Sequence, residues 1–446
     1  MADVYYLVSD LHIGGDEQLQ ECEFKDEFIE FLRGLESTDE DAELIVLGDA
    51  FGLWEFTEVR GLEKFDLLVD HHPELFEQFR ATGEVVDITF IPGNHDAELA
   101  GYADYVDRLA EYNVELEREL YLVRDVGGRR IWIEHGMQRD ANNRLPEFGN
   151  PHANPLGYFV NRHITSKAGQ LSGRGKYNWL KDMQSLTPLE EIPYWILSNY
   201  YYREMSPFLR YAALPFLLLF NFSLVYLVGV VLESTVLGTN FFTSFEWLRG
   251  LGFAGDLLEF VIVVNLVITG LLTVIAVPLF FFFRDAKKTL ERFGLLVPDE
   301  AVTEQDASYL DAAREVFEDH PEAVAFVYGH THRPSLKHVD GRLVVNTGTW
   351  LKRFTRTPAL LGLLPPVYYP SFQLNYFRVS ADPESGAGVL FEYETVEKTA
   401  PKELTLLQRL LIRTPKTQQT IPARTVVGSS AESESERTRS SAPNTD

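Results

Sequence analysis

Seven side chains of types that bind metal ions are spread along the sequence, each close behind a short apolar run. They are Asp10, His12, Asp49, Asn94, His135, His330 and His332. Their donor atoms are oxygen and imidazole nitrogen without any thiolate, a mixture that favours Mn²⁺, with Fe, Zn or Mg as alternatives. The carboxylate of Asp49 has two oxygens and can bridge two ions. Two ions about 3.5–4 Å apart support in-line displacement at phosphorus.

His95 and Asp96 follow directly after one of these side chains. We expect His95 to protonate the leaving oxygen of a phosphate ester and Asp96 to orient the imidazole. Taken singly, each motif has a plainer explanation, because Asp-x-His arises by chance, Gly-Asp often turns the chain, and one histidine after a strand often packs in a core. Their combination in a chain with only 11 histidines favours one shared site.

Short β-prone runs precede the motifs, at residues 4–8, 44–47, 85–91, 130–134 and 324–328. Apolar residues at helical spacing between these runs predict amphipathic helices. Repeated β-loop-α units indicate an α/β domain, which places its ligands at the carboxyl ends of the strands. Residues 372–379 and 389–393 also have strand character and are expected to complete a second sheet.

The order of the motifs resembles that of the calcineurin-like metallophosphoesterase family. The motifs are Asp-x-His, Gly-Asp, Gly-Asn-His-Asp, His and Gly-His-x-His, and the resemblance covers roughly residues 1–145 and 318–395. It implies a four-layer α-β-β-α sandwich with two divalent metal ions. One ion would be held by Asp10, His12, Asp49 and His332, and the other by Asp49, Asn94, His135 and His330, with His95 as the catalytic histidine.

Two features are similar to the UDP-diacylglucosamine pyrophosphatases of lipid A synthesis. They are Gly-His-Thr-His-Arg-Pro at residues 329–334, and Gly-Asp-Ala-Phe at residues 48–51 followed by Trp54. The chain departs from that subfamily at His95, where an arginine is usual, and at residues 136–140. The resemblance therefore implies a membrane-borne phosphate ester rather than lipid A itself.

The composition narrows the classes of partner and compartment. Asp and Glu outnumber Lys and Arg by 66 to 40, for a net charge of −26, which opposes binding to a phosphate backbone, so no nucleic-acid partner is expected. An acidic, solvated surface of this kind is typical of proteins from a high-salt cytoplasm. The single Cys22 excludes an internal disulfide framework. The amino terminus lacks the pattern of a signal peptide.

A long insertion separates His135 from His330. Residues 211–232 and 260–283 within it carry no formal charge. Each run is long enough to span a bilayer, which needs ~20 apolar residues, and buried core helices are the alternative. Basic residues flank the pair of runs, whereas the loop between them has only Arg249. The positive-inside rule then predicts a multi-pass cell-membrane protein with two spans and a cytoplasmic catalytic domain.

The insertion begins with a basic segment. Residues 148–181 contain no Asp or Glu. The candidate substrate-binding side chains are Arg162, His163, Lys167, Arg174 and Lys176 in this segment, together with Arg333 after the last motif. Such a segment is either a lid that receives an anionic head group or a juxtamembrane loop that follows the positive-inside bias.

The organisation expected is a catalytic domain in two parts, interrupted by a transmembrane hairpin. The ranges are 1–147 and 318–398 for the two parts, 148–208 for the basic juxtamembrane segment, 209–232 and 257–283 for the spans, 233–256 for an extracytoplasmic loop, 284–317 for a juxtamembrane helical segment, and 399–446 for a short helix with a disordered tail.

The expected activity is hydrolysis of phosphodiester or pyrophosphate bonds, in lipid-linked substrates by preference, by attack of a metal-bound hydroxide. The alternatives are a phosphatase or nucleotide phosphodiesterase acting on soluble substrates, and a non-enzymatic membrane scaffold. A channel is disfavoured because Asn221 and Asn265 are the only amides in the middle of the spans.

Overall fold

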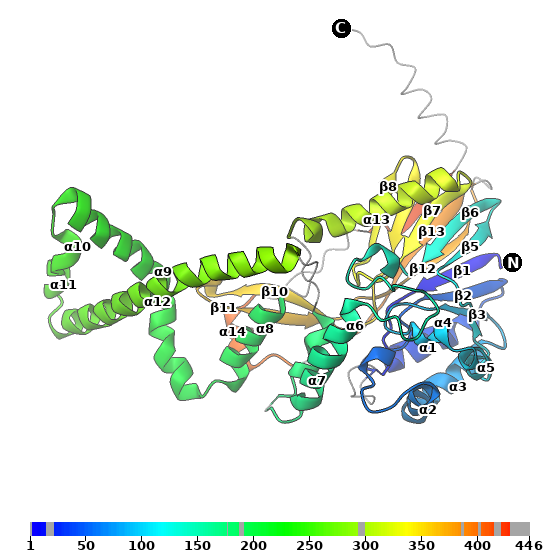
Figure 1. The fold of residues 1–446 in the computed structure, drawn as a ribbon, viewed down its shortest axis with the longest axis horizontal. Helices are drawn as coiled ribbons and strands as arrows, with labels where there is room; N and C mark the ends of the chain where they lie inside the picture. Colours follow the sequence, from blue (N-terminus) through cyan, green and yellow to red (C-terminus); the bar gives the residue numbers. More distant parts are fainter. Residues whose placement is uncertain are drawn as a thin grey trace, which may run out of the picture.

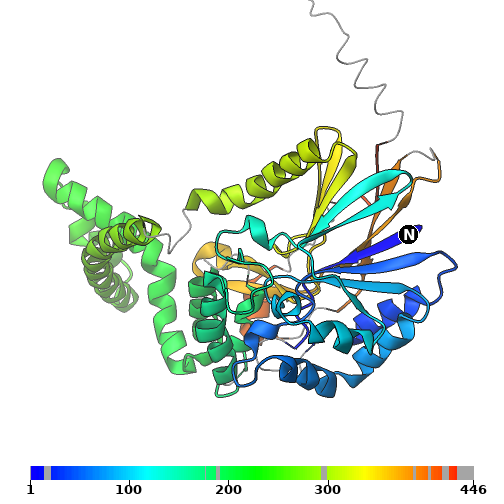
Figure 2. The same cartoon turned by 45° about the vertical axis from the view of Figure 1, so that its right-hand side comes forward.

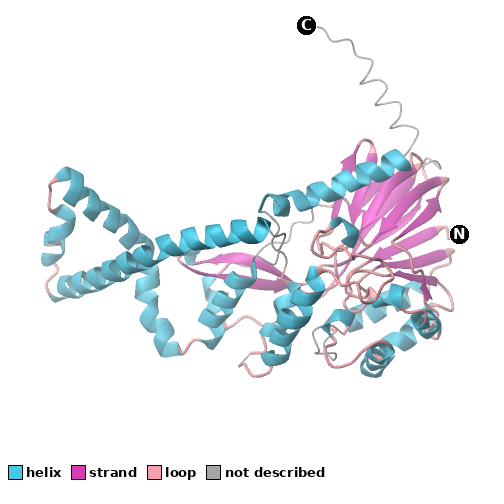
Figure 3. Ribbon diagram, viewed as in Figure 1, coloured by secondary structure: helices cyan, strands magenta, loops and turns pink. Residues whose placement is uncertain are grey.

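The computed structural model describes residues 2–14, 22–175, 177–186, 191–292, 299–384, 388–399, 403–413 and 421–428. Within these residues, two large β-sheets face each other at one end of the molecule, and two long helices cross at the other end (Figure 1). A separate two-stranded hairpin lies between these two parts (Figure 3).

The first sheet has seven strands in the order β14-β13-β12-β1-β2-β3-β4. Its parallel strands are β1 (Val4–Val8), β2 (Ala42–Leu47), β3 (Asp87–Ile91) and β4 (Glu115–Leu116). The antiparallel strands are β12 (Leu374–Ala381), β13 (Val389–Val396) and β14 (Arg424–Val427). Every residue of β1 and β2 is buried, as expected of strands that are covered on both faces.

The second sheet has five strands in the order β5-β6-β7-β9-β8. The strands are β5 (Tyr121–Val126), β6 (Arg129–Glu134), β7 (Ala323–Tyr328), β8 (Ser335–Val339) and β9 (Arg342–Asn346). The strands β6 and β7 are parallel neighbours although the whole insertion lies between them in the sequence. The insertion is therefore part of the crossover connection between two neighbouring parallel strands.

The alternation of side chains along β1 shows how the layers pack. Tyr5 and Leu7 point to the core between the sheets, which also contains Ile131 of β6. Val4 and Val8 point the other way, into a core shared with helices. These helices are α1 (Lys25–Leu35), α2 (Leu62–His71), α3 (Pro73–Thr82) and α5 (Asp104–Ala110). Helix α13 (Asp299–Asp319) covers the outer face of the second sheet, so the expected α-β-β-α order is present (Figure 2).

The hairpin of β10 (Arg353–Ala359) and β11 (Leu364–Ser371) was not expected from the sequence. Four prolines lie between residues 358 and 370, and proline normally argues against a strand because it donates no hydrogen bond to its neighbour. A sheet of only two strands tolerates them because each strand is an edge. The hairpin packs against helix α8 (Ile192–Asn199) of the insertion.

The carboxyl-terminal region corrects one expectation. Helix α14 (Leu406–Leu411) matches the short helix predicted there, but the tail beyond it is not wholly disordered. Residues Arg424–Val427 form β14 and pair with β13, and Val427 is fully buried between the sheets. The β-branched run from Thr425 to Val427 explains why this piece forms a strand. Residues 414–420 and 429–446 lie outside the described part.

The insertion is mostly helical. It contains α6 (Leu156–Val160), a π-helical turn (Asn161–Thr165), α7 (Ser166–Ser172), α8, α9 (Pro207–Leu232), the short helices α10 (Phe241–Ser244) and α11 (Glu246–Arg249), and α12 (Phe253–Arg292). Helices α9 and α12 correspond in position to the two predicted spans. Among the described residues, however, only Phe253–Ala286 is both long and apolar enough to cross a membrane, and Ser223–Leu237 is a shorter apolar stretch.

Candidate metal centre

The seven predicted ligand side chains meet between the two sheets. They lie on the loops after β1, β2 and β3 of the first sheet and after β6 and β7 of the second. The carboxyl ends of parallel strands lie at the same edge of a sheet, and the face-to-face packing brings the two edges together. The strand pattern in the sequence is therefore enough to explain why motifs far apart in the chain become neighbours.

The backbone of these loops is held in an unusual conformation. Among the described residues, ten non-glycine residues have positive φ, and five of them are predicted ligands: Asp10, His12, Asp49, His330 and His332, with φ between 45° and 65°. This region costs of order 1–3 kcal/mol per residue and persists where the surroundings enforce it, typically at functional sites. The strain is concentrated where the loops must aim their side chains inward.

Two glycines allow the loops to approach each other. A Cβ atom at Gly93 would lie 2.2 Å from Oδ1 of Asp49, and one at Gly329 would lie 2.6 Å from Oγ of Ser9 and 2.7 Å from Oδ2 of Asp10. All three distances are far below van der Waals contact. The glycine before each motif is therefore required by the ligands of the neighbouring loops.

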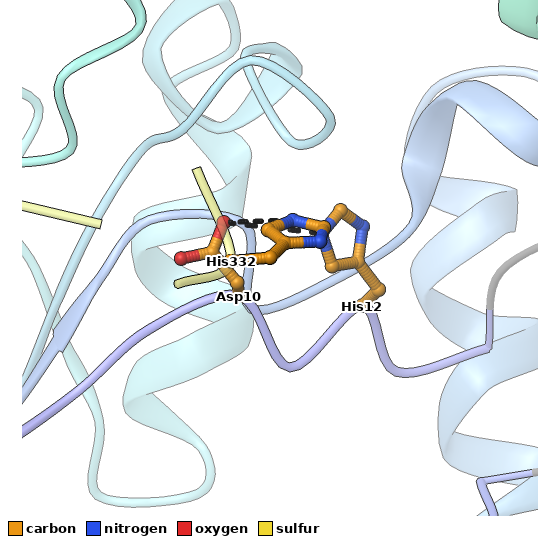
Figure 4. A group of neighbouring side chains, drawn as sticks. All are labelled: Asp10, His12 and His332. Carbon is orange, nitrogen blue, oxygen red and sulfur yellow. Dashed lines mark hydrogen bonds and ion pairs between the residues drawn. The ribbon is translucent and has the colours of Figure 1, made fainter. Parts of the chain in front are cut away.

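The first group of ligands consists of Asp10, His12 and His332, whose side chains point toward one another (Figure 4). Nε2 of His332 lies 3.2 Å from Oδ1 of Asp10 and 3.2 Å from Nε2 of His12. Oδ1 of Asp10 is buried and accepts no hydrogen bond of good geometry from the described residues, the 3.2 Å contact with His332 included. Because buried polar atoms are nearly always partnered, this oxygen fits a metal ligand.

The second group consists of Asp49, His135 and His330, with Asn94 beside it. Nε2 of His135 lies 3.3 Å from Oδ2 of Asp49, 3.3 Å from Nδ1 of His330 and 3.1 Å from Oδ1 of Asn94. The same Oδ2 of Asp49 lies 3.7 Å from Nε2 of His12 in the first group. The carboxylate of Asp49 thus lies between the two groups and is within reach of both.

Charge at the centre also fits divalent cations. Burial acts to raise the pKa of Asp49, but His135 and His95 outweigh it and hold this pKa well below its ordinary value. Burial likewise opposes ionisation of Asp10, and His332 nevertheless lowers its pKa. Two buried carboxylates in ionised form need cations for compensation. Burial and His95 lower the pKa of His12 to about 3, which leaves its imidazole neutral and able to coordinate.

Contacts behind the ligands fix the orientation of two imidazoles. Nδ1 of His135 lies 2.8 Å from the carbonyl oxygen of Leu47, which leaves Nε2 facing the centre. Nε2 of His330 lies 3.0 Å from Oδ2 of Asp140, which leaves Nδ1 facing the centre. Such outer contacts orient metal-binding histidines and strengthen them as ligands. Asp140 was not identified as part of the site from the sequence, and its position shortly after His135 was the available signal.

His95 lies beside the first group but is not oriented by Asp96. Nδ1 of His95 lies 2.8 Å from Oε1 of Glu55, and its ring lies 4.5 Å from the ring of Trp54. The carboxylate of Asp96 instead accepts backbone N–H groups from Gly93, at 2.6 Å, and from Phe51, at 3.2 Å. Asp96 therefore joins two loops, and the prediction that it orients His95 is wrong in this geometry.

Glu55 is the acidic residue that the sequence reasoning missed. It lies on the short helical turn Leu53–Glu55 after β2, and it is 1% exposed. As the only charged residue between Ala50 and Phe56, it offered a signal, because a lone carboxylate in an apolar run is buried with a partner. Burial lowers the pKa of His95, but Glu55 and Asp49 outweigh it and raise this pKa to about 9.

The insertion reaches this part of the site. Nδ2 of Asn161 donates a hydrogen bond of 3.0 Å to Oε1 of Glu55. The next residue, Arg162, donates to the carbonyl oxygens of Phe56 and Thr57, at 2.6 and 2.8 Å. Arg162 therefore docks the insertion onto this loop, and its role in binding substrate stays a prediction.

The other basic residues of the segment do not converge on the centre. His163, Lys167 and Arg174 are exposed, and His163 stacks on Phe159. Lys176 lies outside the described residues. Arg333, in contrast, lines a cavity together with the ligand His332.

Residues 5–225 match the calcineurin-like phosphoesterase family. The chain belongs to this family. It is accordingly a metal-dependent phosphoesterase, and the structure adds the two histidines of the last motif, which lie beyond the matched residues. The fold and the donor set agree with this assignment, whereas neither identifies the metal.

Solved structures with similarity to this phosphoesterase include three of low identity. A predicted phosphoesterase from Streptococcus pneumoniae TIGR4 is 11% identical, with 89% of this chain and 90% of that chain covered and a TM-score of 0.26. Vacuolar protein sorting 29 from Cryptosporidium parvum is 11% identical, with 89% and 92% covered and a TM-score of 0.27. Phosphopantetheinyl hydrolase from Mycobacterium tuberculosis is 14% identical, with 78% and 89% covered and a TM-score of 0.25. No curated protein matches the chain.

Proposed function

We propose that this phosphoesterase is anchored in the cell membrane by α9 and α12, and that it hydrolyses phosphodiester or pyrophosphate bonds of lipid-linked substrates on the cytoplasmic side. The observation that carries the proposal is the surface of α12. Its apolar segment runs from Phe253 to Ala286, and only 17% of the most apolar part is buried. A core helix of a soluble protein would be mostly buried, so exposed apolar surface of this extent fits lipid.

Apolar side chains around the base of α9 support the same proposal. Leu406 and Leu410 of α14 are each 75% exposed, and Phe208 at the start of α9 is 81% exposed. A buried cluster that includes Tyr202 and Leu364 joins α14, the tip of the β10–β11 hairpin and the start of α9 into one unit. These exposed side chains lie where a bilayer surface would meet the catalytic domain.

Basic residues give the proposed orientation. Arg203 and Arg210 precede α9 or lie in its first turn, and Arg284, Lys288 and Arg292 lie near the end of α12. These ends of the two helices are the ones connected to the catalytic domain. Under the positive-inside rule they lie in the cytoplasm, together with the metal centre.

The chemistry follows from the arrangement of the side chains. When bound, divalent ions would neutralise charge on the phosphoryl oxygens and lower the pKa of a coordinated water, and Mn²⁺ is our preferred candidate. Asp10, His12, Asp49 and His332 are placed to hold one ion, and Asp49, Asn94, His135 and His330 the other. Glu55 holds Nδ1 of His95, so that Nε2 is the atom able to donate a proton to the leaving oxygen.

The first test is hydrolysis of bis-p-nitrophenyl phosphate by the full chain in detergent, in high salt, with and without Mn²⁺. The monoester p-nitrophenyl phosphate is run in parallel to separate diesterase from phosphatase activity. Extraction of cell membranes with alkaline carbonate tests the anchor, because an integral protein stays in the pellet. Release of the full chain into the supernatant would refute the anchor, and hydrolysis of neither ester by metal-loaded protein would favour a scaffold.

A further inference from the structure

A cavity of about 320 Å³ opens beside the metal centre. The ligand His332 and its neighbour Arg333 line one side, and Arg353, Arg356 and Tyr368 of the β10–β11 hairpin line another. Its volume is at the lower end of the range of small-molecule sites, which is about 300–1,000 Å³. Because His332 belongs to both, a molecule with a phosphoryl group at the metal centre can place its next group in this cavity.

Two of the cations in the cavity wall are already neutralised. Arg356 pairs with Glu191 at 3.1 Å and lies over the ring of Tyr194. Nζ of Lys352 lies 2.8–2.9 Å from three carboxylates, those of Glu23, Asp182 and Glu403. Neither side chain is left with an unbalanced charge, so neither is the best candidate for binding an anion.

Arg333 and Arg353 differ from these two. In the part of the chain that the structure describes, neither has a carboxylate partner, and the guanidinium of Arg353 donates to the amide oxygen of Gln373. Burial lowers the pKa of Arg353, and the positive charge of Arg333 lowers it further. Two guanidinium groups close enough to repel each other are unfavourable unless an anion lies between or beside them.

We infer that this cavity, with Arg333 and Arg353, binds a second phosphoryl group of the substrate, next to the phosphoryl group that reaches the metal centre. The inference rests on the proposed function and narrows it to substrates with two neighbouring phosphoryl groups, such as a pyrophosphate. The planar guanidinium group matches the oxygens of a phosphoryl group in pairs. Two unbalanced positive charges are also matched better by a phosphoryl dianion than by a single carboxylate.

The far end of the hairpin shows how a lipid-linked substrate would fit. Ala359 and Leu364 at this end pack with Tyr201 and Tyr202, next to Leu214 of α9. Arg353 and Arg356 of the hairpin line the cavity, and the far end of the hairpin lies beside α9 of the proposed membrane anchor (Figure 1). A soluble molecule with two phosphoryl groups would use the same arginines without contacting the far end.

The experiment measures inhibition of bis-p-nitrophenyl phosphate hydrolysis in saturating Mn²⁺. Methylenebisphosphonate carries two phosphoryl groups, and methylphosphonate carries one. We expect wild-type enzyme to bind the bisphosphonate about tenfold or more tightly than the monophosphonate, the effect of one or two charge-assisted contacts. Arg333→Met and Arg353→Met should remove most of this preference, which is the ratio of the two inhibition constants measured within each variant.

Arg356→Met is the matched control, because Arg356 lies in the same wall but is already paired with Glu191. This variant should keep the preference for the bisphosphonate. Arg353→Lys should retain part of it, since the charge remains and the paired geometry is lost. In a second arm, mixed micelles with diacylglycerol pyrophosphate are compared with micelles of phosphatidic acid. A preference for two phosphoryl groups in both arms, lost in the two arginine variants, supports the second phosphoryl site. A larger preference with the lipids than with the phosphonates identifies a lipid as the source of these groups.

The outcomes separate this inference from the proposed function. If wild-type enzyme does not hydrolyse the diester, calorimetric titration of methylenebisphosphonate into the Mn²⁺-loaded protein still tests the arginines. If hydrolysis proceeds and both methionine variants keep the full bisphosphonate preference, the second phosphoryl site is refuted while the phosphoesterase remains. Loss of the preference in Arg356→Met alone would equally overturn the assignment of Arg333 and Arg353.

Discussion

The metal centre and the arginine cavity share His332 but are built in different ways. Every predicted ligand of the centre follows a strand of the two large sheets, and the carboxylates and imidazoles lie close together there. The cavity is lined by a hairpin outside both sheets and by Ser185, Leu186 and Glu191 of the insertion. Two of its cations lack a carboxylate partner among the described residues. In the proposed function, the sandwich supplies the reaction, and the elements added to it select the substrate.

The largest effect should come from the bridging carboxylate. Asp49→Asn keeps the shape of the side chain but removes one of the charges that two ions would share, so bound metal and hydrolysis should both fall to background. Metal content measured by mass spectrometry, together with the diesterase rate, gives the result. The control is Asp340→Asn, which changes an exposed carboxylate on a turn where φ is also positive. Full metal content and activity in Asp49→Asn would remove the centre from the mechanism.

His95 should affect the rate without affecting metal content. His95→Ala should lower kcat by about 10²–10⁴-fold, the usual contribution of a general acid. The loss of kcat should be larger for a phosphate ester with a methanol leaving group, which needs a proton, than for one with a p-nitrophenol leaving group, which leaves as the anion. Equal losses with both leaving groups would argue against His95 as the acid.

Glu55 is a positioning residue for His95. Its substitution should therefore lower kcat with the same dependence on the leaving group as the substitution of His95, but by a smaller factor. Glu55→Gln should lower kcat by about 10–100-fold, as outer contacts of ligand and catalytic histidines do, and the loss should again be greater for the poorer leaving group. Glu58→Gln, an exposed neighbour, is the control. A change in KM or in folding alone would indicate a merely structural role.

The burial of Asp182, which pairs with Lys352 of the cavity wall, predicts that the free energy of unfolding depends on pH. Burial raises the pKa of Asp182 to about 6, because Lys352 lowers it too little and Glu403 adds to the rise. The folded chain then keeps a proton that the unfolded chain releases near pH 4. Stability from this group is complete at low pH and is lost as the pH rises through about 6, by up to about 3 kcal/mol. Thermal unfolding in detergent should show this loss between about pH 4 and about pH 6 in wild type, and Asp182→Asn should not.

The sequence predicted the metal centre better than its surroundings for a physical reason. The ligands need only a strand, a tight loop and a side chain of the right type, all of which are local. Glu55 and Asp140 act through contacts made only after folding, so their types did not reveal which histidine each one orients. Asp96 shows the converse error, since adjacency to His95 in sequence does not place its carboxylate against the imidazole.

The added elements were harder to predict because tertiary packing decides them. Prolines in β10–β11 oppose strands in general, and the hairpin exists because it packs on α8 and needs no further neighbour strand. β14 has only four residues, and it forms a strand because it pairs with the otherwise open edge of β13. The positions of α9 and α12 were predictable from uncharged length, whereas the docking of the insertion through Asn161 and Arg162 was not.

The contact between Asn161 and Glu55 tests whether the sandwich alone carries out the reaction while the added elements only select the substrate. If the insertion served selection alone, Asn161→Ala would leave the rate on bis-p-nitrophenyl phosphate unchanged. Its hydrogen bond to the carboxylate that holds His95 predicts instead a loss in kcat of about fivefold, corresponding to about 1 kcal/mol. Gln170→Ala removes another hydrogen bond between the insertion and the same loop, to Thr57, and should have no such effect.

Asn161→Asp should lower kcat further, because a second carboxylate beside Glu55 would repel it. A loss confined to KM in Asn161→Ala would restore the simple division, whereas a loss in kcat would mean that the insertion also aligns the catalytic histidine.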